Sequence, residues 1–191
     1  MAKLYFYYST MNAGKTTKLL QSNFNYKERG MNTLLYTSVH DNRYGKAKIA
    51  SRIGISENAN TFDESTNIYN EIKSAINKLT LHCVLIDEAQ FLSKQQVKQL
   101  CGIVDDFNIP VLTYGLRTDF LGEPFEGSMY LLLWADELVE VKTVCFCGRK
   151  ATMNAKVING VVIRSGKQID IGGNEKYTSL CRKHYKIGKL R

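Results

Sequence analysis

Residues 4–20 read LYFYYSTMNAGKTTKLL. The aromatic and apolar run over residues 4–8 predicts a buried strand. A turn of small residues follows, and a helix is predicted to open at Lys15. A strand, a tight turn and a helix at the beginning of the chain predict the first unit of an α/β fold.

The turn has the spacing of a phosphate-binding loop, G-x-x-x-x-G-K-[ST], with a serine in place of the first glycine. Its residues, called the P-loop below, are Ser9, Thr10, Met11, Asn12, Ala13, Gly14, Lys15 and Thr16. Backbone N–H groups and the positive end of the helix dipole would converge there on phosphates. Lys15 would reach the outer phosphates and Thr16 would ligate Mg²⁺. The alternative is a glycine turn before an ordinary basic helix, but the strand–helix context favours a nucleotide site.

Composition and length place limits on the class of protein. The chain has 191 residues, 44% hydrophobic and 23% charged, which fits one globular domain with at most a small appendage. No apolar run approaches the roughly 18 residues of a membrane span, and the first residues do not resemble a signal peptide. We therefore expect a cytoplasmic protein that does not enter a membrane. Its five cysteines are then thiols or metal ligands rather than disulfides.

The net charge of +8 is compatible with a nucleic acid or with a phosphorylated small molecule as partner. Part of the excess lies in residues 182–191, a short basic end that we interpret as solvated. Taken with the motifs, we expect a small-molecule partner and no nucleic acid.

Strands and helices are predicted to alternate along the first two thirds of the chain. The first helix ends near Arg29-Gly30, further strands are predicted over 33–37, 83–86 and 109–115, and helices over 64–79 and 93–105. Residues 51–60 have the composition of a loop. This alternation predicts an α/β fold with a parallel sheet, whose ligands bind at the carboxyl ends of its strands. The loop over 40–46 either brings Asp41 and Arg43 to the nucleotide or is only a solvated connection.

Asp87-Glu88-Ala89-Gln90 follows the strand over 83–86. Asp87 would hold Mg²⁺ opposite Thr16, and Glu88 could take a proton from an attacking group. The simpler interpretation is a polar strand end before a turn. The same four residues resemble the second motif of nucleic-acid helicases, which gives a nucleic-acid-stimulated P-loop ATPase as the alternative function. Such motors need a second domain for which this chain has no room.

The loop over 116–127 carries Phe120 and Phe125 and should leave the fourth strand at the ligand edge of the sheet. The two rings either pin the loop to the core or wall a pocket for a flat, mostly apolar ring.

Cysteines mark the C-terminal part of the chain. A further strand is predicted over 137–144. A predicted hairpin, with arms over 157–163 and 168–171, separates Cys145-x-Cys147 from Cys181-x-x-His184. Two pairs of metal ligands separated by a hairpin are typical of a zinc ribbon. Three thiolates and one imidazole would close a structural zinc site, the alternative being three buried thiols and a surface histidine. Cys83 and Cys101 are interpreted as core thiols. We therefore expect a nucleotide-binding domain over 1–143 and a small zinc domain over 144–191.

Seven stretches, taken in order, resemble the zinc-containing thymidine kinases of the cellular and bacterial type. They are residues 9–16, Asp41 to Tyr44, Asp87 to Phe91, Tyr114 to Phe120, Cys145 to Gly148, Ile171 to Tyr177, and Cys181 to His184. The resemblance covers nearly the whole chain. It implies a RecA-like P-loop fold with a zinc-ribbon-like end, and transfer of the ATP γ-phosphate to the 5′-hydroxyl of thymidine or deoxyuridine with Mg²⁺, giving dTMP in deoxynucleotide salvage.

The resemblance also implies roles for residues. Glu88 matches the catalytic base. The ATP site is matched by the P-loop together with Asp41, Arg43 and residues 87–90. The zinc ligands are matched by Cys145, Cys147, Cys181 and His184. Positions matching the nucleoside site are Met11, Phe91, Leu116, Phe120, Phe125, Asn154, Ile171, Gly172 and Tyr177. Asn154 departs from the threonine of many relatives, and Ser9 and the C-x-C spacing are further departures. A homotetramer inhibited by dTTP is implied as well.

Overall fold

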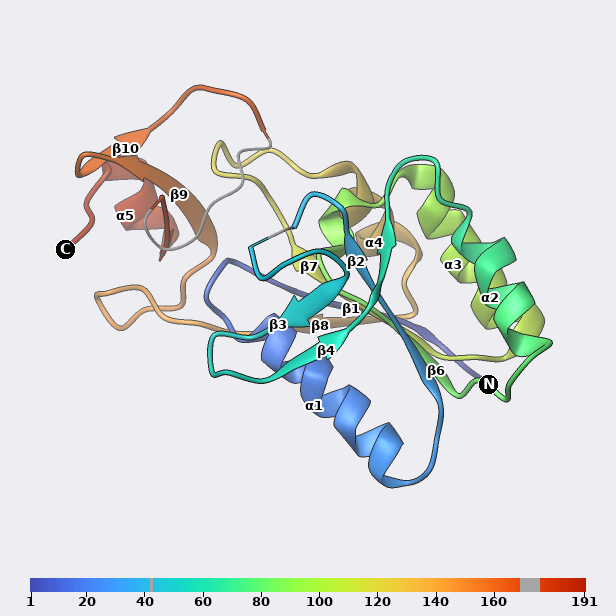
Figure 1. Cartoon of the computed structure of the whole chain (residues 1–191). Coiled ribbons are helices and arrows are strands. Elements are labelled where there is room, and N and C mark those ends of the chain that lie inside the picture. The colour runs from blue at the N-terminus through green and yellow to red at the C-terminus, as the bar shows by residue number, and fades with distance from the viewer. Residues whose placement is uncertain (42, 169–175) are drawn as a thin grey trace.

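The computed structural model describes residues 1–41, 43–168 and 176–191. In this part of the chain the main sheet has six strands, all parallel, in the order β5-β2-β6-β7-β1-β8 (Figure 1). The strands are β1 (Leu4–Ser9), β2 (Thr33–Ser38), β5 (Asn60–Phe62), β6 (Cys83–Ile86), β7 (Val111–Leu116) and β8 (Glu137–Glu140). The α/β fold with a parallel sheet is confirmed.

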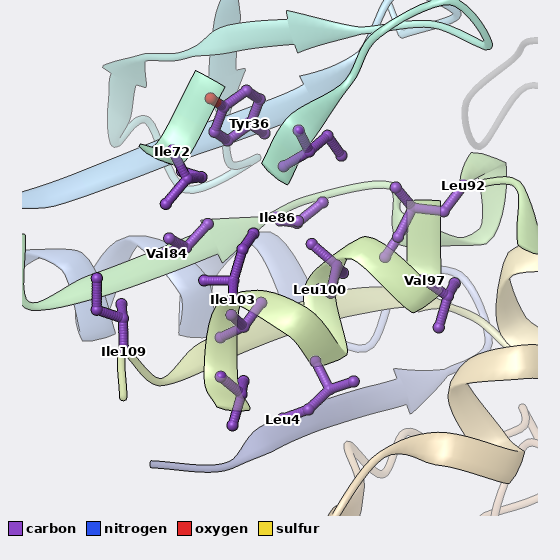
Figure 2. Close-up of a cluster of buried hydrophobic side chains, with 14 of the residues drawn as sticks. Leu4, Tyr36, Ile72, Val84, Ile86, Leu92, Val97, Leu100, Ile103 and Ile109 are labelled. Atoms are coloured by element: carbon purple, nitrogen blue, oxygen red, sulfur yellow. The ribbon is translucent and has the colours of Figure 1, made fainter. Parts of the chain in front are cut away.

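Helices cover both faces of this sheet. On one face lies α1 (Lys15–Glu28), and on the other lie α2 (Ile68–Ile76), α3 (Lys94–Phe107) and α4 (Glu126–Trp134), with the short helix η1 (Ala89–Phe91) after β6 (Figure 1). Strand β6 is buried on both sides. Val84 and Ile86 join the core under α2 and α3, which Figure 2 shows, whereas Cys83 and Leu85 join the core under α1.

Local signals explain where the helices begin. Ser93 caps α3 in a reciprocal capping box with Gln96, as an N-terminal serine does. The helix predicted over 64–79 is shorter, because Asn67 caps α2 and the side chain of Asp63 holds residues 65 and 66 in a turn. The helix α4 was not predicted.

Residues 48–58 correct a second prediction. The stretch over 51–60, predicted as a loop, contributes β4 (Ser56–Asn58), which pairs with β3 (Lys48–Ala50) in an antiparallel hairpin, and the start of β5. Ile49 anchors the hairpin in the core beside α1. The strand predicted over 137–144 also ends earlier, at Glu140.

A second, antiparallel sheet has the order β10-β9-β11, from β9 (Met153–Ile158), β10 (Val161–Ile163) and β11 (Tyr177–Leu180), and carries α5 (Arg182–Ile187). In Figure 1 it lies beside the end of the main sheet where β1 leads into α1. The hairpin predicted from arms over 157–163 and 168–171 is placed differently, because residues 157–163 themselves contain the turn between β9 and β10. Gln168 is not in a strand, and the rest of the predicted segment 168–171 lies outside the described residues.

Among the residues that the structure describes, no helix combines the length and the apolar character needed to cross a bilayer.

Candidate active site

The P-loop joins β1 to α1 as the spacing predicts. Gly14 has φ +79° and Asn12 has φ +60°, so two residues of the turn are left-handed. A Cβ at Gly14 would touch no protein atom, so glycine serves the backbone conformation there rather than packing. Ser9 ends β1 and is not among the residues with positive φ. A serine can therefore replace the first glycine of the motif without strain.

Lys15 folds back onto the turn. Its Nζ donates a hydrogen bond to the Thr10 carbonyl oxygen at 2.7 Å. Burial lowers the pKa of Lys15 to about 8; the carboxylates of Glu88 and Asp87 oppose this shift, and the cations Arg43 and Arg52 add to it.

Thr16 and Asp87 meet as predicted. The Thr16 hydroxyl donates to Asp87 Oδ2 at 2.9 Å, and Asp87 is buried. Burial, then the neighbouring charge of Glu88, raise the pKa of Asp87 to about 7. The hydroxyl of Thr16 at the start of α1 and the buried carboxylate of Asp87 after β6 are oxygen ligands that suit a hard divalent cation such as Mg²⁺.

Glu88 has φ +51°, a conformation that costs energy for a residue with a Cβ and that recurs at functional sites. Its carboxylate accepts hydrogen bonds from Arg43 Nη2 at 2.8 Å and from Gln90 Nε2. Arg43 also forms a two-point ion pair with Asp41, at 2.6 and 2.9 Å. The loop over 40–46 therefore brings Asp41 and Arg43 to the P-loop side of the fold.

Gln90 connects Glu88 to the next loop. It is buried, and its Oε1 accepts a hydrogen bond from the Leu116 backbone N–H at 3.0 Å. A Cβ at Gly115 would lie 3.0 Å from both the backbone nitrogen and Oε1 of Gln90, so the glycine leaves room for this contact.

One cavity of about 350 Å³ runs from the P-loop to a set of aromatic side chains. Its apolar end is lined by Met11, Phe91, Leu116, Phe120, Phe125 and Tyr177. The rings of Phe91 and Phe125 meet edge-on with their centroids 5.8 Å apart, and the ring centroids of Phe120 and Tyr177 are 6.3 Å apart. Phe120 and Phe125 are both buried, so they fix the loop and wall the cavity at once.

Other predicted residues have mixed outcomes. Asn154 lines the cavity, but its side-chain amide is bonded to the backbones of Met11 and Thr118. Ile171 and Gly172 lie outside the described residues. No role was predicted for the cavity residues Ser51, Arg52, Ile53, Asp119 and Gln168. Asp119 lies within the matching stretch 114–120, whereas the other four come from a hairpin and a loop without a motif.

The cysteine end forms one cluster. The ligand atoms of Cys145, Cys147, Cys181 and His184 all lie within 4.8 Å of one another. His184 Nδ1 is 3.4 Å from the Cys145 sulfur and 3.5 Å from the Cys181 sulfur. Although burial alone raises it, hydrogen bonds from the backbones of Cys147 and Cys181 leave the pKa of Cys145 lowered to about 6. Three sulfurs and one imidazole fit a structural zinc ion.

Comparison with known proteins gives one family. The family model described as "Thymidine kinase" matches residues 2–185. The chain is 62% identical to the thymidine kinase of Haemophilus influenzae Rd, over 97% of each chain. It is 60% identical to that of Mannheimia succiniciproducens (100% of this chain, 99% of the relative) and 60% identical to that of Aliivibrio fischeri (99% and 100%). The chain therefore belongs to the thymidine kinase family.

Proposed function

We propose that this protein transfers the γ-phosphate of ATP to the 5′-hydroxyl of thymidine, and of deoxyuridine, giving the 5′-monophosphate and ADP. The observation that carries the proposal is that the P-loop, Glu88 and the aromatic walls line the same cavity. A phosphate donor and a flat nucleoside base would thus reach the same carboxylate from opposite sides. The family relationship supports the same activity.

The donor phosphates would lie on the P-loop amides, with Lys15 and Arg43 against their outer oxygens. Thr16 and Asp87 would hold Mg²⁺, whose chemistry is to neutralise charge on the β- and γ-phosphate oxygens. Lys15 would exchange its bond to the Thr10 carbonyl for a phosphate oxygen. Ala89 and Gln90 complete the proposed donor side.

Glu88 would act as the base. The 5′-oxygen attacks the γ-phosphorus as the bond to the β,γ-bridging oxygen breaks, and the hydroxyl proton passes to Glu88. Arg43 and Gln90 hold one carboxylate oxygen each, so the group is oriented before substrate arrives.

The thymine ring would lie between the aromatic side chains of the cavity, near Met11 and Leu116. Aromatic walls suit a flat ring, and the size of the cavity suits a nucleoside rather than a polymer. Asn154, Ile171 and Gly172 complete the proposed nucleoside site.

The cluster of Cys145, Cys147, Cys181 and His184 would hold zinc in a structural role, since no open ligand position is needed for this chemistry. We propose that this ion stabilises a small domain over 144–191, with the nucleotide-binding domain over 1–143. Thiol ligands fit a reducing compartment, which favours the cytoplasm.

A homotetramer is proposed on the family resemblance. Exposed apolar side chains support association: Leu133 and Trp134 on α4 and Leu138 on β8, where β8 is an edge strand of the main sheet.

Inhibition by dTTP is proposed on the same resemblance, because a triphosphate of the product nucleoside could occupy both ends of the cavity.

The test is to incubate the protein with labelled ATP and Mg²⁺, first with thymidine and then with single-stranded nucleic acid. We expect labelled dTMP in the first incubation, separated by chromatography. Release of phosphate that depends on nucleic acid, without dTMP, would instead support the P-loop ATPase.

A further inference from the structure

The hairpin β3–β4 reaches the cavity with its tip. Ser51, Arg52 and Ile53 line the same space as the P-loop. The hairpin is held in place at its base, where Ile49 is buried beside α1 and Glu57 pairs with Lys27 at 2.9 Å. A backbone hydrogen bond of 2.9 Å from the Ser51 N–H to the Ile55 carbonyl closes the tip.

Arg52 lies against the middle of the P-loop. Its Nη1 donates a hydrogen bond to the side-chain oxygen of Asn12. Asn12 sits between Met11, which contacts the small sheet on the nucleoside side, and Gly14, which precedes the helix. The guanidinium is therefore placed where the donor and acceptor ends of the cavity join.

Charge and burial give an independent sign that an anion belongs there. After burial and Arg43, the cation of Arg52 makes a smaller contribution to the lowered pKa of Lys15, which the carboxylates of Glu88 and Asp87 oppose. Beside it, the Ser51 hydroxyl is buried, with the residue only 6% exposed, and has no hydrogen-bond partner among the described residues. A buried hydroxyl in a folded protein nearly always has a hydrogen-bond partner, so a ligand oxygen or an ordered water is expected to satisfy that of Ser51.

We propose that Arg52 binds the γ-phosphate of ATP from the side opposite Lys15 and stabilises the charge on the transferring group. This role rests on the proposed kinase function and adds a residue to it. The γ-phosphate is favoured over the inner phosphates because α1 begins at Lys15, whereas Arg52 contacts the loop two residues before Gly14. A planar guanidinium can bind two phosphate oxygens at once, and the Ser51 hydroxyl could donate to a third.

The experiment compares nucleotides that differ only in the γ-phosphate. Binding of ADP and of an ATP analogue with an imido β,γ-bridge is measured by calorimetry for the wild type, Arg52→Gln, Arg52→Lys and Lys48→Gln. Lys48→Gln is the matched control, since it removes an exposed cation from the same hairpin outside the cavity. Turnover is measured in parallel at saturating thymidine.

We expect Arg52→Gln to lower the affinity for the ATP analogue by about tenfold or more and the affinity for ADP by less than about twofold. The turnover number should fall by about 10²-fold, because an interaction with developing charge is lost, while the KM for thymidine changes little. Arg52→Lys should recover part of the loss, and Lys48→Gln should match the wild type.

The proposal would be overturned if Arg52→Gln lowered the affinities for ADP and for the ATP analogue equally, or if it lowered neither affinity. The nucleotide comparison does not depend on which acceptor is phosphorylated. If the wild type made no dTMP, the proposed function would fail, and the binding data would still report on Arg52.

Discussion

The side-chain oxygen of Asn154 in β9 accepts a hydrogen bond from the backbone N–H of Met11 in the P-loop, at 2.8 Å. Ser179, which lies opposite Asn154 in the small sheet, donates its hydroxyl to the Met11 carbonyl at 2.6 Å. Both backbone groups of one P-loop residue are thus held by the sheet that carries the cysteine cluster. Asn154 also donates to the Thr118 carbonyl at 2.9 Å and so ties the P-loop to the loop after β7.

Asn154→Leu should therefore destabilise the protein and disturb the cavity. Leucine has the same number of side-chain heavy atoms in a similar branched shape, but it leaves the Met11 N–H and the Thr118 carbonyl without a partner, which should cost about 2 kcal/mol or more in the free energy of unfolding. The KM for thymidine should rise as well. Urea denaturation and steady-state kinetics measure the two effects. Thr178→Val is the matched control, because it changes a neighbouring polar residue of β11 that does not line the cavity. A variant as stable as the wild type would show that the two bonds contribute little.

Loss of the metal should reach the P-loop through the same contacts. Elemental analysis should find about one zinc per chain in the wild type and in Cys101→Ser, and much less in Cys147→Ser. Because the small sheet holds Met11, Cys147→Ser should also bind ATP more weakly, which calorimetry measures. Full zinc content in Cys147→Ser would remove that residue from the ligand set. Unchanged ATP affinity in a zinc-free sample would show that the sheet holds the P-loop without the ion.

The parts of the fold that sequence predicted are those with strong local signals. A continuous apolar run gave β6 with its observed bounds, and Ser93 marked the start of α3 because its capping contact lies within four residues. The P-loop was found for the same reason. Asp87 and Glu88 needed only the rule that parallel strands present their carboxyl ends at one edge.

Other parts lack such a signal. The helix α4 is mostly apolar on all sides and carries Gly127 in its first turn, so its sequence shows no helical periodicity. The same glycine lets α4 pack against η1, because a Cβ at this position would lie 2.5 Å from the Ala89 carbonyl oxygen. Asn154 and Ser179 contact Met11 across 143 and 168 positions of the chain. Nothing near any of the three residues encodes that contact, because it depends on how the small sheet docks.

Gln90 offers a test of how Glu88 is oriented. Gln90→Leu would free one oxygen of the Glu88 carboxylate and leave the Leu116 N–H without its acceptor. We expect the turnover number to fall by about 10- to 100-fold, because a displacement of about 1 Å in a catalytic group can slow the reaction by about 10²-fold. ATP affinity should fall by less than the turnover number does, although Gln90 also belongs to the proposed donor side. Gln95→Leu, at an exposed position of α3, is the control. A loss of ATP affinity at unchanged turnover would show that Gln90 serves the donor side alone and does not orient Glu88.

The buried carboxyl of Asp87 should make stability depend on pH in the absence of nucleotide and metal. Its folded-state pKa is raised from 3.8 to about 7 by burial and by Glu88, so the folded protein keeps this proton after the unfolded chain has lost it. Stability should therefore decrease as pH rises from about 4 to about 7, relative to Asp87→Asn, which cannot ionise. Urea denaturation of both proteins across this range measures the difference. Parallel stability curves would show that Asp87 ionises normally in the folded state.

Glu88→Gln tests the proposed base most directly. The amide keeps the shape of the side chain and one of its two acceptor oxygens but cannot take a proton, so turnover should fall by about 10²–10⁴-fold while ATP still binds. Single-turnover formation of dTMP and calorimetry with the imido analogue separate the two effects. Glu123→Gln, in the loop after β7 but outside the cavity, controls for the loss of a nearby negative charge. A Glu88→Gln variant with most of its activity would mean that the 5′-hydroxyl loses its proton to another group. The strained backbone at residue 88 would then need a different explanation.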